Sequence, residues 1–224
     1  MNNVLTFTQE PVNTKVSCFT LDQLKLLDQI CSYSVEEYIH RGYFQGFQKR
    51  TIKLFNKKEQ SFPSGFLERV LFHFKNLNIE TQVQRQPDPQ PTLELDFKGE
   101  LRPYQAEDLT KILKYQRGCI QWPPSAGKTV LISSLIAYRG IGPVLVLVHT
   151  KDLQKQMVDS LERFLQTKVG LIGGGNLKIR PITVSTVQTI HRRLEENDKK
   201  ICEYIKTIKM LVVDEVHHLP SEQI

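Results

Sequence analysis

Hydrophobic and polar residues follow two different patterns along this chain of 224 residues. Before about residue 90, short apolar stretches switch between helical spacing and alternation. Thr20 precedes the first helical stretch as a candidate cap. The pattern predicts a helix, two strands, a helix and a strand, over residues 20–31, 31–39, 50–55, 64–77 and 78–84. This order is typical of a small α+β domain.

After residue 100 the pattern becomes a regular alternation of amphipathic helices and almost wholly apolar strands. Helices are predicted over residues 102–116, 128–139, 150–165 and 188–206. Strands are predicted over residues 118–122, 143–149, 168–172, 181–186 and 209–215. Apolar strands between amphipathic helices indicate a parallel sheet covered on both faces, in a doubly wound α/β fold. Ligands of such sheets bind at the carboxyl ends of the strands.

The two patterns meet at a proline-rich stretch. The segment QPDPQPTLELD, residues 86–96, has three prolines within six positions, which suits an extended linker. We therefore expect an accessory domain over residues 1–90, a linker over 91–100 and an α/β domain over 101–224.

Composition favours a cytoplasmic protein with a polyanionic partner. The N-terminus lacks the features of a signal peptide, and no apolar run approaches the roughly 18 residues that cross a bilayer. The four scattered cysteines favour free thiols over disulfides or a zinc site. Residues 1–100 carry 12 basic and 12 acidic side chains, whereas residues 101–224 carry 18 and 12. The net charge of +6 therefore comes from the second half.

Within the neutral half, residues 41–58 contain six basic residues and no acidic one. We expect the basic residues, Lys49 and Arg50 among them, to contact nucleic acid. The interspersed aromatic residues have two interpretations, namely core packing of the small domain or stacking on bases. Core packing is the favoured one for Tyr43, Phe44, Phe47 and Phe55.

Residues 121–129, QWPPSAGKT, form a candidate phosphate-binding loop. Gly127, Lys128 and Thr129 follow a predicted strand and begin a predicted helix, which is the context that such a loop requires. In that context phosphates face the helix N-terminus and the backbone N–H groups of the loop Pro124–Gly127. Pro124 belongs to this loop but has no N–H group. Lys128 would reach the β- and γ-phosphates of ATP, and the Thr129 hydroxyl would bind Mg²⁺. The alternative is an ordinary strand-to-helix turn with an exposed lysine.

A second motif, MLVVDEVHH, places Asp214 and Glu215 just after an apolar strand. An aspartate there can hold Mg²⁺, and the adjacent glutamate can accept a proton from the attacking water. We assign catalytic roles to Lys128, Asp214 and Glu215. The alternatives are a solvated strand end, or zinc bound by Asp214 with His217 and His218, although the H-E-x-x-H spacing is absent.

These motifs resemble those of superfamily 2 helicases. SAGKT and DEVH resemble motifs I and II, and LRPYQ resembles the entry motif of the branch that contains XPB, RecG and the restriction translocases. VHTKDLQKQ, IGGG and STVQT resemble motifs Ia, Ib and Ic, in family order. The likeness covers residues 101–218, and a looser one to UvsW-like helicases extends over the N-terminal domain. It implies a RecA-like domain of the P-loop NTPase class.

The resemblance also implies roles for individual residues. Gln105 would read the adenine edge, as a bidentate glutamine can, with Arg102 and Tyr104 beside it in the ATP site. The residues implied in nucleic-acid contact are Thr150, Lys151, Gly173, Gly174, Thr186, Gln188, Arg192 and Arg193. The partner would be branched or duplex DNA, with RNA open.

The chain departs from the family in two respects. Trp122 and Ser125 stand where many family loops have alanine and the first glycine. Motif III and the second RecA-like domain, with its arginines, would lie after residue 218, in cis or on another chain. We therefore expect this chain alone to bind nucleotide and DNA without unwinding. A binding module without turnover and the motor subunit of a restriction-type translocase remain alternatives; LRPYQ and STVQT disfavour a small-molecule kinase.

Overall fold

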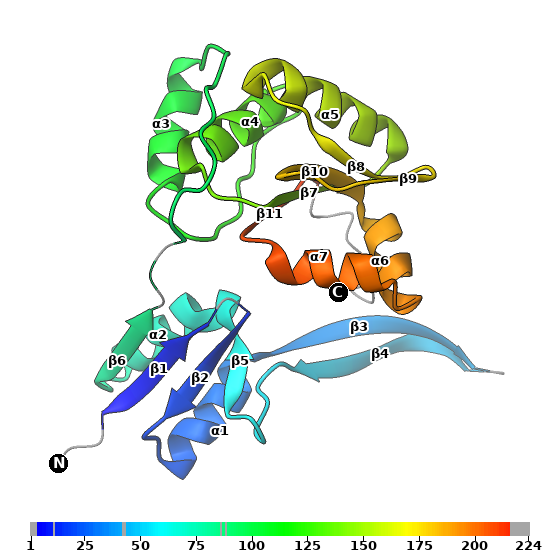
Figure 1. Cartoon of the computed structure of the whole chain (residues 1–224). Coiled ribbons are helices and arrows are strands. Elements are labelled where there is room, and N and C mark those ends of the chain that lie inside the picture. Colours follow the sequence, from blue (N-terminus) through cyan, green and yellow to red (C-terminus); the bar gives the residue numbers. More distant parts are fainter. Residues whose placement is uncertain (1–3, 11, 42–43, 86, 88, 216–224) are drawn as a thin grey trace. The chain divides into compact units, whose positions relative to one another are not determined.

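The computed structural model describes residues 4–10, 12–41, 44–85, 87 and 89–215. The chain divides into two compact units, unit 1 over residues 1–87 and unit 2 over residues 88–224 (Figure 1). Each unit has its own buried core, and we describe each by itself. In the described part of the chain, no helix is long and apolar enough to cross a membrane.

Unit 1 combines a four-stranded sheet, two helices and a separate hairpin. Its elements are β1 (Leu5–Gln9), β2 (Asn13–Ser17), α1 (Leu21–Ile30), β3 (Ser32–Arg41), β4 (Phe44–Lys53), β5 (Ser61–Pro63), a 3₁₀ turn (Ser64–Phe66), α2 (Leu67–Asn76) and β6 (Thr81–Arg85). The sheet has the order β5-β2-β1-β6, and β3 pairs only with β4. Phe7 is fully buried, and its ring lies 6.0 Å from the rings of both Phe62 and Phe74.

The α+β class of unit 1 is confirmed, but the predicted strand set is incomplete. Helices α1 and α2 lie within the predicted ranges, β6 overlaps its range and ends one residue later, and Thr20 caps α1 by accepting a hydrogen bond from the N–H of Gln23. The prediction omits β1, β2 and β5. Residues of β1 alternate between buried and partly exposed, which is a strand pattern, but the run is only five residues long and its last buried position is the polar Gln9. Strand β4 begins six residues earlier than predicted.

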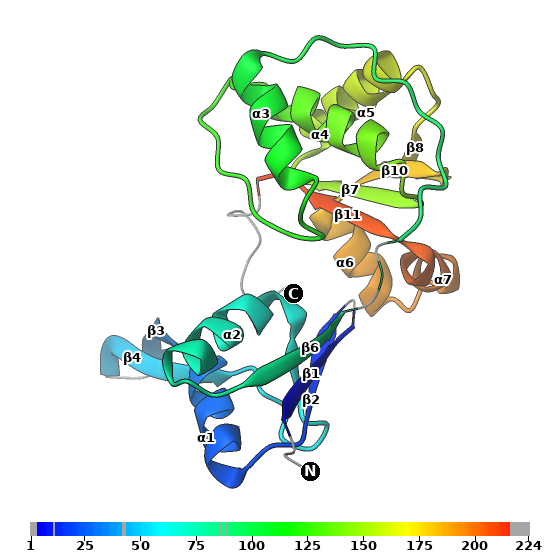
Figure 2. The same cartoon turned by 90° about the vertical axis from the view of Figure 1, so that its left-hand side faces the viewer.

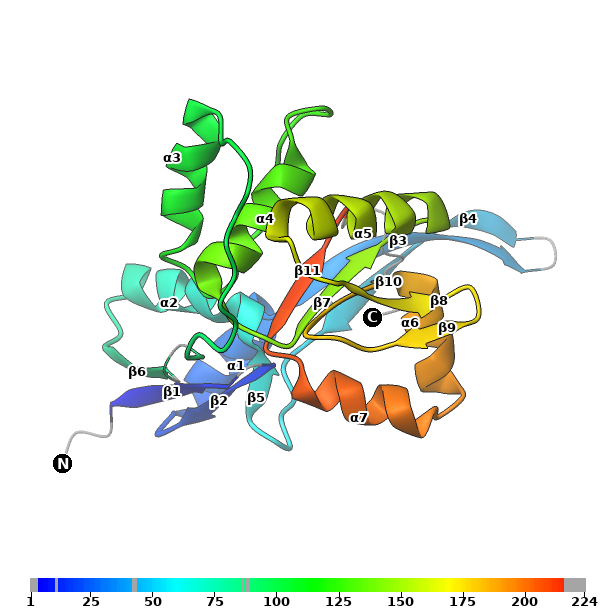
Figure 3. The same cartoon turned by 45° about the horizontal axis from the view of Figure 1, so that its top comes forward.

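Unit 2 has the doubly wound α/β fold that the alternation predicts. Its elements are α3 (Pro103–Ile112), α4 (Lys128–Arg139), β7 (Val144–Val148), α5 (Lys151–Leu165), β8 (Gly170–Gly173), β9 (Asn176–Lys178), β10 (Ile182–Thr186), α6 (Val187–Glu195), α7 (Lys199–Thr207) and β11 (Met210–Val213). The sheet has the order β11-β7-β10-β8-β9 (Figure 3). Its first four strands are parallel, and β9 is antiparallel to β8.

Helices cover both faces of this sheet, α4 and α5 on one and α6 and α7 on the other (Figure 1). Strand β7 shows why both faces need a cover. Val144, Val146 and Val148 pack with α4 and α5, whereas Leu145, on the other face, packs with Ile201 of α7. A strand buried on both sides is almost continuously apolar. The expected fold class is confirmed.

Two of the elements predicted for unit 2 are wrong. Residues 118–122, all of which the structure describes, form no strand, and β11 is an edge strand of the sheet. Residues 118–122 do not pair with the free side of β11, and Ile120 is 42% exposed. The predicted helix over residues 188–206 is two helices, because Asn197 takes a positive φ of 53° and Asp198 caps α7.

The predicted linker has the irregular, extended form that its sequence indicates. Residues 91–100 form no regular element, as expected, but they belong to unit 2 and pack on it. The N–H groups of Thr92 and Leu93 both donate to the carbonyl of Gly140, at 2.7 Å. Leu93 and Leu95 pack on the core beneath α4 and α5, and the ring of Phe97 lies 5.7 Å from that of Phe164. Alternate apolar side chains fix this extended segment along the domain.

Candidate nucleotide-binding site

The candidate site lies at one edge of the unit 2 sheet. Because β7, β8, β10 and β11 are parallel, their carboxyl ends share that edge (Figure 3). The ends of these strands and the segments that follow them contain the acidic pair and those predicted nucleic-acid residues that lie in unit 2. The fold therefore brings together motifs that are far apart in the sequence.

The loop before α4 has the geometry of an anion cradle. Gly127 is the N-cap of α4 with φ 83°, a conformation that favours glycine. A Cβ at this position would lie 2.5 Å from Nε2 of Gln105. Ser125 also has positive φ, 62°, which explains why a glycine is usual there in related loops. The loop residues Pro123, Pro124 and Ser125 are exposed, so the N-terminal end of α4 is accessible to a phosphate.

Lys128 and Glu215 meet at this edge. Lys128 Nζ lies 3.0 Å from Glu215 Oε1, although the two residues are 87 positions apart in the sequence. Both side chains are about one third exposed, at 33% and 30%. The N–H of Asp214 donates to the carbonyl of Leu147 at 2.9 Å and so continues the ladder between β11 and β7. The loop and the acidic pair therefore belong to one site.

Asp214 is half-buried, and its carboxyl group is electrostatically disfavoured as an anion. Burial raises the pKa of Asp214, the negative charge of Glu215 raises it further, and Lys128 partly opposes both. A divalent cation beside this carboxylate would relieve the cost. Thr129 and Asp214 supply the oxygen donors that Mg²⁺ prefers.

The zinc alternative gains no support. No group of three or more His, Cys, Asp or Glu side chains suited to a metal occurs within the described residues. His217 and His218 lie outside them.

Gln105 ties α3 to the loop. Its side chain is 2% exposed, its Nε2 donates to the carbonyl of Ala126 at 2.9 Å, and its Oε1 accepts from the N–H of Arg102 at 2.9 Å. The Tyr104 hydroxyl donates to the same Ala126 carbonyl at 2.8 Å, and Arg102 Nη1 donates to that hydroxyl at 3.3 Å. The three residues assigned to the adenine side therefore cluster beside the loop. Both groups of the Gln105 amide are engaged.

Trp122 and Asp108 complete this cluster, and neither has a predicted role there. The Trp122 indole N–H donates to Asp108 Oδ2 at 3.0 Å, and its ring packs edge-on against Tyr104 at 5.4 Å. Helix α3, which carries Asp108 and Tyr104, lies beside α4 (Figure 2). The residues that enter the loop are thus held by a helix and not by a sheet neighbour. No spacing rule links Trp122 to Asp108, so the sequence offers no signal for this contact.

The segments after β7 and β8 are turns with partly accessible residues. Thr150 caps α5 by accepting from the N–H of Leu153 at 3.2 Å, and Lys151 is exposed beside it. Gly173 and Gly174 take φ values of 138° and 57° in the turn between β8 and β9. Gly173 is buried and Gly174 is exposed.

Gln154 of α5 has no predicted role, yet it connects the strands at this edge. It is 5% exposed, and its Nε2 donates to the carbonyls of Ile172 at 2.9 Å and Val184 at 3.1 Å. One amide thus ties α5 to both β8 and β10. The sequence places Gln154 within the segment that resembles motif Ia. That resemblance does not show that Gln154 is buried while neighbouring polar residues are exposed.

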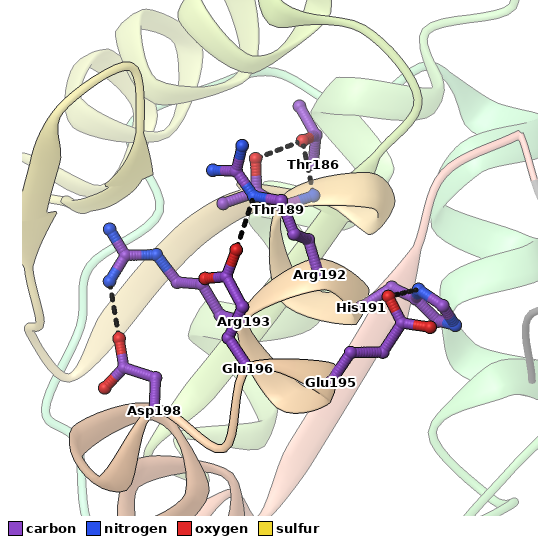
Figure 4. A network of polar contacts seen from close by, with 8 residues as sticks. All are labelled: Thr186, Thr189, His191, Arg192, Arg193, Glu195, Glu196 and Asp198. Atoms are coloured by element: carbon purple, nitrogen blue, oxygen red, sulfur yellow. Dashed lines mark hydrogen bonds and ion pairs between the residues drawn. The ribbon is translucent and has the colours of Figure 1, made fainter.

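The residues after β10 differ in accessibility. Thr186 is 4% exposed and caps α6, accepting from the N–H of Thr189 at 3.3 Å. Its hydroxyl also lies 2.8 Å from that of Thr189 (Figure 4). Gln188 is exposed. The geometry gives Thr186 a capping role and leaves Gln188 accessible to a ligand.

Arg192 and Arg193 are neighbours with different surroundings (Figure 4). Arg193 Nη1 lies 2.8 Å from Asp198 Oδ2, and both side chains are largely covered. Desolvation raises the pKa of Asp198, but the N–H of Ile201 and the Arg193 guanidinium outweigh it and hold that pKa below its ordinary value. Arg192 is 68% exposed and lies 3.8 Å from Glu196. Arg193 therefore joins α6 to α7, and only Arg192 extends into solvent.

In unit 1, the candidate nucleic-acid residues lie on the β3–β4 hairpin. Lys49 and Arg50 are both exposed, but as neighbours on β4 they point to opposite faces. The expectation that the aromatic residues form the core holds for Phe55, which is 6% exposed, and is wrong for Phe47, which is 72% exposed. Tyr43 lies outside the described residues, as does the side chain of Phe44.

Comparisons with known proteins identify the family. The model of the family described as type III restriction enzyme, res subunit, matches residues 98–224. A DNA 3'-5' translocase XPB2 of Sulfurisphaera tokodaii is 36% identical over 154 residues, covering 69% of this chain and 33% of that protein. A putative DNA 3'-5' helicase Rad25 of Haloarcula marismortui is 32% identical over 136 residues, covering 58% of this chain and 20% of that protein. The chain thus spans a third or less of these relatives.

Among solved structures, a crystal structure of the UvsW helicase from bacteriophage T4 matches with a TM-score of 0.73 at 18% identity. The match covers 98% of this chain and 85% of that one, so it includes both units. A likeness at this identity supports the fold alone. With the match to the family model, the chain belongs to the type III restriction enzyme res-subunit family, within the superfamily 2 DNA helicases and translocases.

Proposed function

We propose that this chain binds Mg-ATP at the loop before α4 and acts as the first motor domain of a DNA translocase or branch-migrating helicase. Unit 1 serves it as an accessory nucleic-acid-binding domain. The observation that carries the proposal is the 3.0 Å pair between Lys128 and Glu215, which joins a phosphate-type loop to a strand-end acidic pair. DNA as the substrate follows from the names of the relatives.

Each residue of the site has a role that suits its position. The loop N–H groups up to Gly127 and the N-terminus of α4 face the phosphates, and Lys128 leaves Glu215 to bind the β- and γ-phosphates. Bound Mg²⁺ neutralises phosphate charge, and Thr129 and Asp214 are the residues that would hold it. Glu215, once released from Lys128, accepts the proton of the attacking water.

The adenine side is formed by the cluster on α3. Gln105 reads the adenine edge through its amide, as a glutamine can do in a bidentate contact. Tyr104 and Arg102 line this side, and Ala126 connects it to the phosphate loop through the carbonyl that Gln105 and Tyr104 share. Reading the base therefore alters the hydrogen bonds that hold the loop.

Turnover needs a second RecA-like domain, in cis or from another chain. Arg193 is engaged with Asp198, and helix α6, which carries both arginines, lies on the sheet face opposite α4 (Figure 1). They do not supply the positive charge that stabilises the leaving phosphate. In related phosphoryl transfers that charge contributes about 10³–10⁵ in rate, or roughly 4–7 kcal/mol of barrier.

The test measures binding and turnover separately. Lys128→Ala should weaken binding of a non-hydrolysable ATP analogue to this chain, as measured by calorimetry. Lys151→Ala, at an exposed lysine on the same edge, should leave that affinity unchanged and weaken DNA binding. Glu215→Gln should abolish DNA-stimulated ATPase activity in a version extended through the second domain.

Two results would reject the assignment. Unchanged nucleotide affinity in Lys128→Ala would remove the loop from the site. Robust DNA-stimulated turnover by the 224-residue chain alone would show that the missing charge is already present.

A further inference from the structure

The β3–β4 hairpin is separate from the four-stranded sheet of unit 1. Its strands pair over ten residues each, from Ser32 opposite Lys53 to Arg41 opposite Phe44. Figure 1 shows them as a long ribbon that runs beyond the four-stranded sheet. No described side chain of either strand belongs to the buried core of unit 1. The hairpin is therefore free to serve a purpose other than folding.

One face of this ribbon carries a pair of exposed aromatic rings. Tyr38 and Phe47 lie opposite each other across the strands, with ring centroids 5.3 Å apart and an interplanar angle of 68°. They are 59% and 72% exposed. In this edge-to-face arrangement one ring face stays open to a further ring. Two large exposed aromatic groups side by side mark an interaction surface more often than they serve folding.

One basic side chain lies beside the rings and can meet an anionic group of a partner. Lys49 lies on the same face, one rung along from Phe47, and opposite Glu36. Within the described residues, no carboxylate lies within ion-pair distance of Lys49. Ser34 and Thr51 form the next rung and add two hydroxyl groups. The segment of residues 44–58 contains no acidic residue.

The base of the hairpin is fixed to α1. Asp28 Oδ2 lies 2.8 Å from Lys53 Nζ and 3.1 Å from Lys57 Nζ. The hydrogen bond from Lys53 lowers the pKa of Asp28 below its ordinary value, with help from Lys57 and against desolvation. Asp28 therefore engages both lysines at the base of the ribbon and leaves one positive charge in excess there. Among the described residues, Lys49 is a basic residue beside the rings with no carboxylate at ion-pair distance.

We propose that the face formed by Tyr38, Phe47 and Lys49 binds unpaired bases of single-stranded DNA. The rings stack on bases, Lys49 neutralises a phosphate, and the hydroxyls of Ser34 and Thr51 donate to the backbone. A duplex keeps its bases stacked inside, so it offers these rings little. The proposal rests on the proposed function, because a DNA translocase that acts on branched substrates meets single-stranded segments.

The test uses the 224-residue chain without nucleotide. A fluorescently labelled oligo-dT and a duplex of the same length are titrated, and binding is followed by anisotropy. Phe47→Ala should raise the Kd for the single strand about fivefold or more, given the usual contribution of base stacking. The duplex Kd should change by less. Lys49→Gln should reduce the salt slope for the single strand by about 0.7.

Phe72→Ala is the matched control. Phe72 is a 62% exposed ring on α2 of the same unit, packed edge-on against His73 at 6.0 Å. Its removal should leave the single-strand Kd within about twofold of the original chain. Phe47→Leu keeps the apolar area and removes the aromatic face, so it should behave like Phe47→Ala. Thermal melting of each variant shows whether unit 1 is intact.

Three outcomes would overturn the proposal. Phe47→Ala could bind the single strand as tightly as the original chain, which would leave the rings for a protein partner. It could weaken single strand and duplex equally, which would exclude unpaired bases as the ligand. Phe72→Ala could have the same effect as Phe47→Ala. Failure to bind ATP would refute the proposed function and leave these titrations unaffected.

Discussion

Replacing Glu215 by glutamine should tighten nucleotide binding, even though it removes the proposed general base. In the free protein Lys128 is held by Glu215 at 3.0 Å, and it must leave that carboxylate to reach a phosphate. Glutamine keeps the size of the side chain and removes the charge. Nucleotide binding then no longer has to break the ion pair, so the binding free energy becomes more favourable by the free energy of that pair.

The exposure of the pair sets the magnitude. With side chains 33% and 30% exposed, the pair belongs near the upper end of the range for accessible ion pairs, about 1 kcal/mol. Removing the negative charge of Glu215 also removes any repulsion between it and the phosphates, which acts in the same direction and which salt reduces. The ion pair alone predicts a Kd about five times lower for Glu215→Gln.

The assay is equilibrium titration with a non-hydrolysable Mg-ATP analogue, followed by the fluorescence of Trp122, the single tryptophan of the chain. The Trp122 indole is hydrogen-bonded to Asp108 beside the loop, so we expect nucleotide binding to change the surroundings of the indole. Glu107→Gln is the matched control, because Glu107 also pairs with a lysine, Lys111, at 2.8 Å. That variant should bind nucleotide like the original chain.

An equal or weaker affinity in Glu215→Gln would refute the reasoning. It would show that Lys128 does not leave the Glu215 carboxylate for a phosphate when nucleotide binds. It would also show that Glu215 contributes favourably to nucleotide affinity. The gain should also shrink at high salt, since the pair is partly exposed.

Three further predictions concern stability. Asp214→Asn should raise the melting temperature at pH 7 and not below about pH 4: the pKa of Asp214 is raised in the folded protein, so its ionisation costs stability as pH rises above the unfolded value of about 3.9. Melting curves at both pH values test the sign, and equal gains at both would contradict it. Trp122→Phe should lower stability by about 0.5–1 kcal/mol in urea titrations, because water can replace the lost bond at Asp108, which is 35% exposed; no change would mean that the bond contributes nothing. Arg193→Ala should lower the melting temperature and leave DNA affinity intact, because Asp198 engages the guanidinium; the opposite pattern would assign Arg193 to DNA.

Much of unit 2 could be predicted from the sequence, because its apolar strands and amphipathic helices differ in period. The parallel order then places Glu215, which follows β11, at the carboxyl edge without any knowledge of contacts. The sequence places Lys128 at the same edge only through an expected strand over residues 118–122, which the structure lacks, so its approach to Glu215 is seen in the structure alone. The sequence pattern also misses β1. Its alternate residues are polar, and the strand is recognised only when the structure shows Phe7 in a buried core.

The side-chain contacts between distant segments were beyond prediction for a different reason. The bond from Trp122 to Asp108 and the bridge from Gln154 to two strands depend on positions fixed by tertiary packing. Phe47 illustrates the converse, since composition favours a buried ring and the pairing of β3 with β4 exposes it.

The absence of a strand before the nucleotide loop bears on how the site fluctuates. The loop is secured by Gln105, Tyr104 and Asp108, all on α3, and the buried ladder of the sheet does not include residues 118–122. Helix α3 and the loop can therefore open together while the central strands stay protected, as one low-stability cooperative unit. Hydrogen exchange would report them as a single fast-exchanging block. A nucleotide that slows hydrogen exchange in this block would stabilise the loop and α3 together, a stabilisation that the sheet does not provide.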